Sequence, residues 1–303
     1  REFQYNESSI DDNDSTSTKD FRSYVEFQNE VFTNIESKHI IKLDVTQNVI
    51  KNTENKSSMV IPFFPATLNS VIRNICKDGD KCFNDIDKVL WIYQIADAFK
   101  DLSSYLANLD DSQIDFKNSI FDQSFYIDSM KNIYLCMLAY DIKMESSKST
   151  SEGPMYFRLD SNPSYFYTFG VLMFEIFTEM EVKNIFGNLP SLKRQEILSK
   201  GYSNFNSFQE YLKECRKKYD DDKLFEIINR CLINNPNHEE SFKNFEEVIN
   251  EIKNLKLYKK YQNIIEEREE NAKVIDNQYC FTFHDLMTSS VLNLLDLNKI
   301  LDS

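Results

Sequence analysis

The stretch from Tyr165 to Thr178, YFYTFGVLMFEIFT, constrains the fold more than any other part of the chain. Gly170 and Glu175 interrupt it, but its other residues are apolar, aromatic or small, so the sequence offers almost no polar face to solvent. A helix of this composition is buried on all sides. A membrane span needs about 20 uninterrupted apolar residues, and this run is shorter and contains a glutamate. The sequence therefore predicts a core helix against which other helices pack, and no membrane span.

The charge of the chain limits the kinds of partner that it can bind, and its cysteines indicate the cellular compartment. The 303 residues include 35 basic and 49 acidic side chains, a net charge of -14, which repels phosphate backbones. Nucleic acid is therefore not an expected partner. The N-terminus lacks the basic and apolar pattern of a secretory signal. Because the six cysteines form neither a CxxC pair nor a Cys/His cluster, we interpret them as free thiols and expect a cytoplasmic location.

Hydrophobic periodicity predicts the other elements, since helical spacing indicates helices and alternation indicates strands. Besides the core helix, the predicted helices span residues 20–37, 67–75 and 87–109. The predicted strands span residues 2–5 and 40–45, with two more around a polar loop at 52–58 and a further two around a turn at 129–132. Strands thus gather before residue 66, and helices dominate the remainder of the chain.

The segment KNSIFDQSFYIDSMKNIYLCMLA, residues 117–139, follows the long helix predicted at 87–109 and resembles the catalytic segment of protein kinases. In that family a catalytic loop, His-Arg-Asp-Leu-Lys-Pro-x-Asn, precedes two short strands and an Asp-Phe-Gly. GPMYFRLD, residues 153–160, resembles the Ala-Pro-Glu segment, and the core helix follows where the family has its central large-lobe helix. Residues 223–252 resemble the closing helix pair. Upstream, Glu30 and His39 are spaced like the small-lobe helix glutamate and the histidine after it.

The resemblance implies an α+β, two-lobed protein kinase-like fold. It divides the chain into a reduced β-rich small lobe at 1–66, a mainly helical large lobe at 67–255 and a helical C-terminal extension at 256–303. The first small-lobe strands and the glycine-rich loop would be missing or lie upstream of residue 1. The extension predicts an amphipathic helix at 255–275 and a second apolar run at 283–301. Both either pack on the large lobe or offer an apolar face to a partner.

Kinase chemistry needs an aspartate that orients the acceptor hydroxyl, a lysine on the phosphates, and carboxylate and amide oxygens that hold two magnesium ions. In the gapless register Ser119 stands at the catalytic aspartate, Phe121 at its neighbouring lysine, Ser124 at the metal-binding asparagine and Met137 at the metal-binding aspartate. A serine hydroxyl accepts no proton at neutral pH, and a thioether is too soft a ligand for magnesium. Tyr165 also replaces the aspartate that braces the catalytic loop. The resemblance thus implies vestigial catalytic and metal positions.

The lysine that binds the nucleotide phosphates in the family is missing as well. No lysine precedes Lys19, which leaves Glu30 without the strand lysine that pairs with it in the family. The position of the hinge between the lobes comprises Ile61, Pro62, Phe63 and Phe64. We therefore expect no resident cofactor, and ATP would be bound only without its usual magnesium ligands.

These positions imply a pseudokinase, an inactive kinase-like domain that binds other proteins as a signalling or scaffold module. One alternative is an active serine/threonine or tyrosine kinase with displaced groups at Asp115 and Asp141, which requires residues inserted between two strands that already fit. A second alternative is an unrelated helical interaction domain. The histidines His39, His238 and His284 are interpreted as a packing or capping residue, a loop residue and a tail residue, which disfavours a hydrolase triad.

Overall fold

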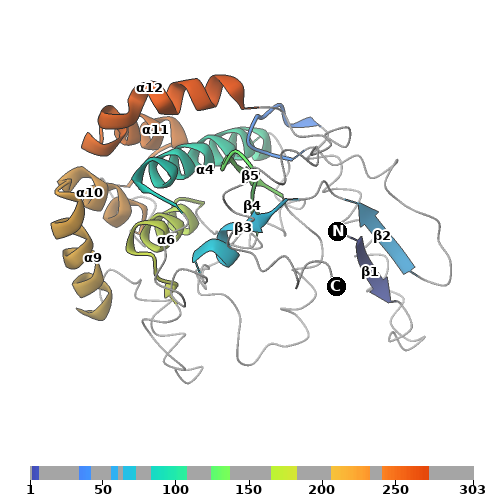
Figure 1. The fold of residues 1–303 in the computed structure, drawn as a ribbon, viewed down its shortest axis with the longest axis horizontal. Helices are drawn as coiled ribbons and strands as arrows, with labels where there is room; N and C mark the ends of the chain where they lie inside the picture. The colour runs from blue at the N-terminus through green and yellow to red at the C-terminus, as the bar shows by residue number, and fades with distance from the viewer. Residues whose placement is uncertain are drawn as a thin grey trace.

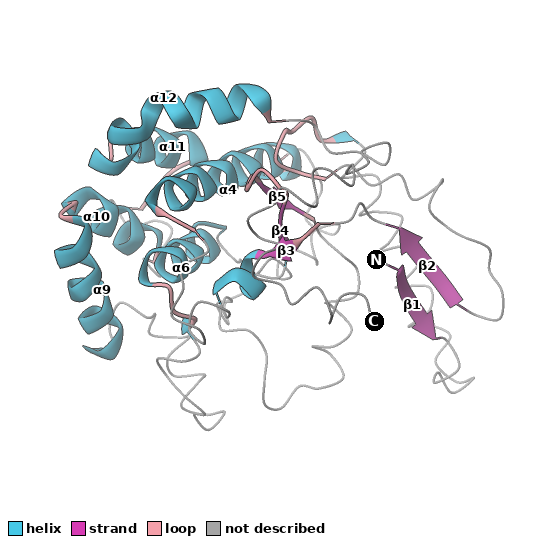
Figure 2. Cartoon of the chain, in the orientation of Figure 1, coloured by secondary structure: helices cyan, strands magenta, loops and turns pink. Residues whose placement is uncertain are grey.

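A computed structural model of the 303-residue chain describes residues 2–6, 34–41, 56–60, 64–72, 83–107, 124–136, 165–182, 206–232 and 241–272 (Figure 1). Its strands are β1 Glu2–Asn6, β2 Lys56–Val60, β3 Ala66–Thr67, β4 Phe125–Ile127 and β5 Ile133–Leu135. Its helices are α4 Asp85–Leu106, α6 Tyr165–Thr178, α9 Asn206–Tyr219, α10 Asp222–Cys231, α11 Phe245–Lys253 and α12 Lys256–Asn271. Helices predominate over two small antiparallel sheets, so the described part of the chain is α+β (Figure 2).

Helix α6 is the buried core helix that the sequence predicts, with the predicted ends. Every residue from Tyr167 to Phe177 is buried, and α4, α9 and α10 contact the helix. Glu175 is tolerated in this core because its side chain accepts a hydrogen bond from the backbone N–H of Val182 at 2.8 Å. Gly170 allows the close approach of α10, since a Cβ at this position would lie 2.8 Å from the Cβ of Cys231.

Helix α4 confirms the long helix predicted from Asp87, although it begins two residues earlier. The reason is a capping box: the Asn84 side chain accepts the N–H groups of Ile86 and Asp87, and the Asp87 carboxylate accepts the Asn84 N–H at 3.0 Å. The predicted apolar stripe is buried as far as Leu102. Its buried members are Val89, Leu90, Ile92, Ile95, Ala96, Phe99 and Leu102. The stripe positions α4 against α6, α11, α12 and β5.

Strands β4 and β5 form the hairpin predicted around residues 129–132, with Phe125 opposite Leu135. Strand β3 pairs antiparallel with β4 on one side. On the other side, residues 39–41 run parallel to β5, and the Leu135 N–H donates to the His39 carbonyl at 2.8 Å. This pairing confirms the beginning of the strand predicted at 40–45, whose remainder lies outside the described residues.

Strand β1 confirms the strand predicted at 2–5, whereas β2 begins inside a predicted loop. Strand β2 pairs antiparallel with β1, and Asn6 lies opposite Lys56. The polar loop predicted at 52–58 is therefore wrong from residue 56 onward. The polar composition of residues 56–58 indicated a turn, but their backbone groups find partners in a strand about 50 residues away, which local pattern cannot reveal. The predicted helix at 20–37 lies almost entirely outside the described residues, and that at 67–75 is described as a short helical segment at 68–72.

Helix α12 packs on α4 and α11, so the first helix of the predicted C-terminal extension lies against the rest of the fold (Figure 1). Tyr258 and Ile265 are its buried residues. Ile264, predicted on the apolar side, is 41% exposed, because the buried face is rotated toward Tyr258 and Ile265. The apolar run predicted at 283–301 lies outside the described residues. Each helix in the described ranges is too short or too polar to cross a membrane.

Candidate functional site

Two of the positions to which the kinase resemblance assigns chemistry lie among the described residues, namely Ser124 and Phe64. The catalytic and metal positions Ser119, Phe121 and Met137, the helix residue Glu30, and the hinge residues Ile61, Pro62 and Phe63 lie outside them. The displaced candidates Asp115 and Asp141 are likewise outside. The structure therefore bears on the predicted site only through the β4–β5 hairpin and its neighbours.

Ser124 lies at the open end of that hairpin. It is buried directly before β4, and its carbonyl accepts the backbone N–H of Cys136 at 2.8 Å. The hairpin register thus brings the position of the metal-binding asparagine opposite Cys136, and the next residue in the chain is Met137, the position of the metal-binding aspartate. Magnesium prefers hard oxygen ligands, which these side chains do not supply as a set. No group of three His, Cys, Asp or Glu residues in the described ranges could hold a metal ion.

Phe64, the last hinge position, packs on the small sheet. Its ring lies 5.4 Å from the ring of Tyr126 and 5.9 Å from the ring of Tyr134, centroid to centroid. Such tilted pairs of aromatic rings are favourable contacts in a protein interior. The hinge position is therefore part of an aromatic cluster. Tyr165, which stands at the position of the family's bracing aspartate, stacks on Phe99 at 5.5 Å. Its hydroxyl is buried with no hydrogen-bond partner among the described residues.

A buried polar network, which sequence reasoning missed, links the sheet to α12. Gln94 of α4 accepts the backbone N–H of Ile133 at 2.8 Å and donates to Glu269 at 2.7 Å. The other oxygen of Glu269 lies 3.0 Å from Nε2 of His39. His39 is thus the buried packing residue that we expected, but its partner lies 230 residues away on α12. Neither residue carries a local sequence signal for this pairing.

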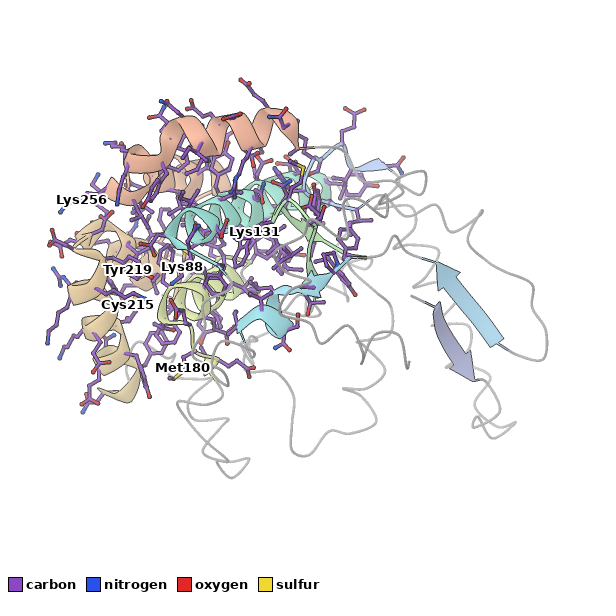
Figure 3. The ribbon with its side chains drawn as sticks, viewed as in Figure 1. Lys88, Lys131, Met180, Cys215, Tyr219 and Lys256 are labelled. Atoms are coloured by element: carbon purple, nitrogen blue, oxygen red, sulfur yellow. The ribbon has the colours of Figure 1, made fainter. Side chains whose placement is uncertain are left out.

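A second unpredicted cluster surrounds the beginning of α4. The Asp87 side chain is fully buried and accepts hydrogen bonds from Lys131 and Arg268, each at 2.9 Å. Next to it, the ammonium groups of Lys88 and Lys218 both bond Glu179. Lys88 also donates a hydrogen bond to the hydroxyl of Tyr219, and both residues are labelled in Figure 3. Buried carboxylates keep their charge when cations pair with them. Two carboxylates therefore hold four cations in this region.

The pKa of Glu179 reflects this pairing. Burial alone would raise it, but the hydrogen bonds and charges of Lys88 and Lys218 outweigh burial and lower the pKa to about 2. Asp128, in the β4–β5 turn, shows the opposite balance. Its pKa is raised because burial outweighs the hydrogen bonds that it accepts from Asn132, Tyr134 and the backbone of Met130.

A hollow of about 450 Å³ adjoins the second cluster. Its apolar lining comes from Phe83, Ile86 and Tyr261. Its charged lining comes from Lys88, Lys131, Asp85 and Glu179. The volume lies within the roughly 300–1,000 Å³ that is usual for ligand sites. The hollow is thus a place where a small group carrying both charge and apolar surface could bind.

Comparison with known proteins does not assign the chain to a family. No protein-family model matches it, and a search of curated proteins finds no match either.

Proposed function

We propose that the chain is a pseudokinase: a two-lobed protein kinase-like domain that has lost phosphoryl transfer and acts in the cytoplasm as a protein interaction or signalling module. The order of the described elements supports this proposal. A long helix (α4) precedes a short hairpin (β4–β5), a buried helix (α6) follows, and a pair of helices (α10 and α11) closes the pattern. The kinase resemblance requires this order. A shared order of elements supports the fold, whereas function must be argued from the site.

The observation that carries the proposal is the backbone hydrogen bond between Ser124 and Cys136. In an active kinase the asparagine and the aspartate that hold magnesium must approach each other. The hairpin register brings position 124 opposite Cys136, and position 137 is the next residue in the chain. The side chains that the sequence provides there are a serine and a methionine. The hairpin pairing is thus consistent with the gapless alignment to the kinase pattern, in which both metal ligands are lost.

Without a metal site, the other catalytic-loop positions could not carry out phosphoryl transfer. Ser119 provides no proton acceptor, and Phe121 provides no cation at the position of the catalytic-loop lysine. Because catalytic groups act as a unit, one remaining group contributes little alone. The role that remains for such a domain is to bind other proteins, and the packing of α12 on α4 gives it a fixed surface on which to do so.

A phosphotransfer assay with labelled ATP, magnesium and a mixed protein substrate tests the proposal. We expect no incorporation above background from the parent chain or from Ser119→Asp, because the variant restores a base to a site that has no metal and no lysine. Transfer by the parent would support the alternative of an active kinase with displaced groups. In that case Asp115→Asn and Asp141→Asn should each abolish the transfer, and the pseudokinase proposal would be wrong.

A further inference from the structure

The ion-pair cluster around the hollow beside the beginning of α4 has a surplus of one positive charge. Lys131 and Arg268 share Asp87, and Lys88 and Lys218 share Glu179. One further carboxylate, that of Asp85, lines the hollow. Lys88 and Lys131 line the hollow together with Asp85 and Glu179, and Arg268, Lys218 and Asp87 pair with lining residues from next to it. In this set four cations lie near three carboxylates, whereas the chain as a whole has a net charge of -14. Opposite signs at an interface select a partner by electrostatic complementarity, and this surplus favours an acidic partner.

Two of these cations retain hydrogen-bonding capacity. A lysine ammonium group has three N–H donors. Among the described residues, Lys88 donates to Glu179 and Tyr219, and Lys131 donates to Asp87 only. One donor of Lys88 and two of Lys131 therefore have no described acceptor, and both side chains line the same hollow. The Lys88 side chain is only 1% exposed, so an acceptor that reached it would be shielded from water.

The remaining lining is apolar and aromatic. Phe83 and Ile86 lie at the beginning of α4, and Tyr261 lies on the facing side of α12. Such a surface suits an aliphatic side chain next to the charged one, as in interfaces that combine an apolar centre with a few placed charges. A free inorganic anion would leave this apolar surface uncovered.

We propose that this hollow is a docking site for an acidic peptide segment of a partner protein, in which a glutamate or aspartate carboxylate binds Lys131 and Lys88 and an adjacent aliphatic side chain packs on Phe83, Ile86 and Tyr261. The proposal deepens the interaction role proposed above by assigning it a surface and a class of partner. Its test is independent of catalysis, so a failed peptide experiment and an unexpected phosphotransfer result are distinguishable.

Fluorescence anisotropy with a labelled peptide that alternates glutamate and leucine tests the site. The decisive variant is Lys131→Asn, since Lys131 has a backbone φ of 66° and asparagine tolerates this left-handed conformation. Asp87 keeps Arg268 as its partner in this variant. The matched control is Lys256→Asn, because Lys256 is 69% exposed, pairs with Asp220 and does not line the hollow (Figure 3).

We expect the parent and Lys256→Asn to bind the peptide equally and Lys131→Asn to bind it about tenfold more weakly, equivalent to about 1.4 kcal/mol. Lys131→Arg keeps the positive charge and should bind the peptide like the parent. This variant shows whether the weaker binding of Lys131→Asn comes from the lost charge or from a disturbed fold. Three results would each overturn the proposal: no binding by the parent, equal binding of a peptide with glutamine in place of glutamate, or equal binding by Lys131→Asn. Displacement of the peptide by an equal concentration of inorganic phosphate would also overturn it, because the hollow would then be a phosphate site.

Discussion

Truncation of Phe174 should remove a large part of the stability of the fold. The Phe174 side chain is fully buried at the centre of α6, and its ring stacks on that of Phe208 in α9 at a centroid distance of 4.1 Å. Replacement of a buried phenylalanine by alanine typically costs 3–5 kcal/mol, the sum of lost transfer free energy and a cavity. Because a domain has a total stability of about 5–15 kcal/mol, Phe174→Ala should lower the free energy of unfolding by about a fifth or more.

Urea unfolding followed by circular dichroism measures this loss. The matched control is Met130→Ala, which also truncates a large apolar side chain but at a position that is 59% exposed in the β4–β5 turn. The control should change the free energy of unfolding by about 0.5 kcal/mol or less, as surface substitutions usually do. Equal unfolding midpoints for Phe174→Ala and the parent, with unchanged slopes, would mean that α6 is not the core helix. The kinase-like interpretation would then have no support.

Three further predictions concern the hairpin, the cation cluster and a vestigial site. Asp128→Ala should lower the free energy of unfolding by about 1–3 kcal/mol, measured by urea unfolding, because it leaves buried N–H donors unsatisfied. Since Glu179 has its pKa lowered from 4.5 to about 2, its stabilising contribution is complete above pH 4.5 and is lost as the pH falls toward 2. In Lys88→Met the pKa of Glu179 is lowered less, so urea midpoints measured against pH should show a smaller loss between pH 4.5 and 2 than in the parent. Met137→Leu should cost about 1.5 kcal/mol or less by the same unfolding assay, since the substitution conserves volume.

Features that depend on local pattern were predictable. The apolar composition of residues 165–178 gave the buried helix α6 with its ends, and the spacing from Val89 to Leu102 gave the buried stripe of α4. Alternation on either side of residues 129–132 predicted the β4–β5 hairpin. Both strands of this hairpin are short, and all of their residues are buried. In α4 the period of apolar residues reports directly which face packs against the core, whereas α6 and the two strands are buried on all sides and are recognised by their apolar composition.

Features that depend on distant partners were not predictable. The strand at residues 56–60 forms because β1 pairs with it, and the His39–Glu269 contact joins residues that have no sequence relation. The same holds for Lys88, which a sequence pattern would place at the surface of a helix but which Glu179 and Tyr219 allow to be buried. Ionisable residues are buried only when a partner compensates them, and single-sequence periodicity does not identify the partner.

A thermal-shift titration with ATP, with and without magnesium, tests the pseudokinase proposal most directly. A ligand at a hundred times its dissociation constant adds about 2.7 kcal/mol of stability, which such a titration detects readily. The proposal assigns Ser124 and Met137 to the positions of the magnesium ligands, and it therefore predicts that magnesium adds nothing to whatever small shift ATP produces alone through the hinge. A clear rise in melting temperature that requires both ATP and magnesium would contradict the proposal.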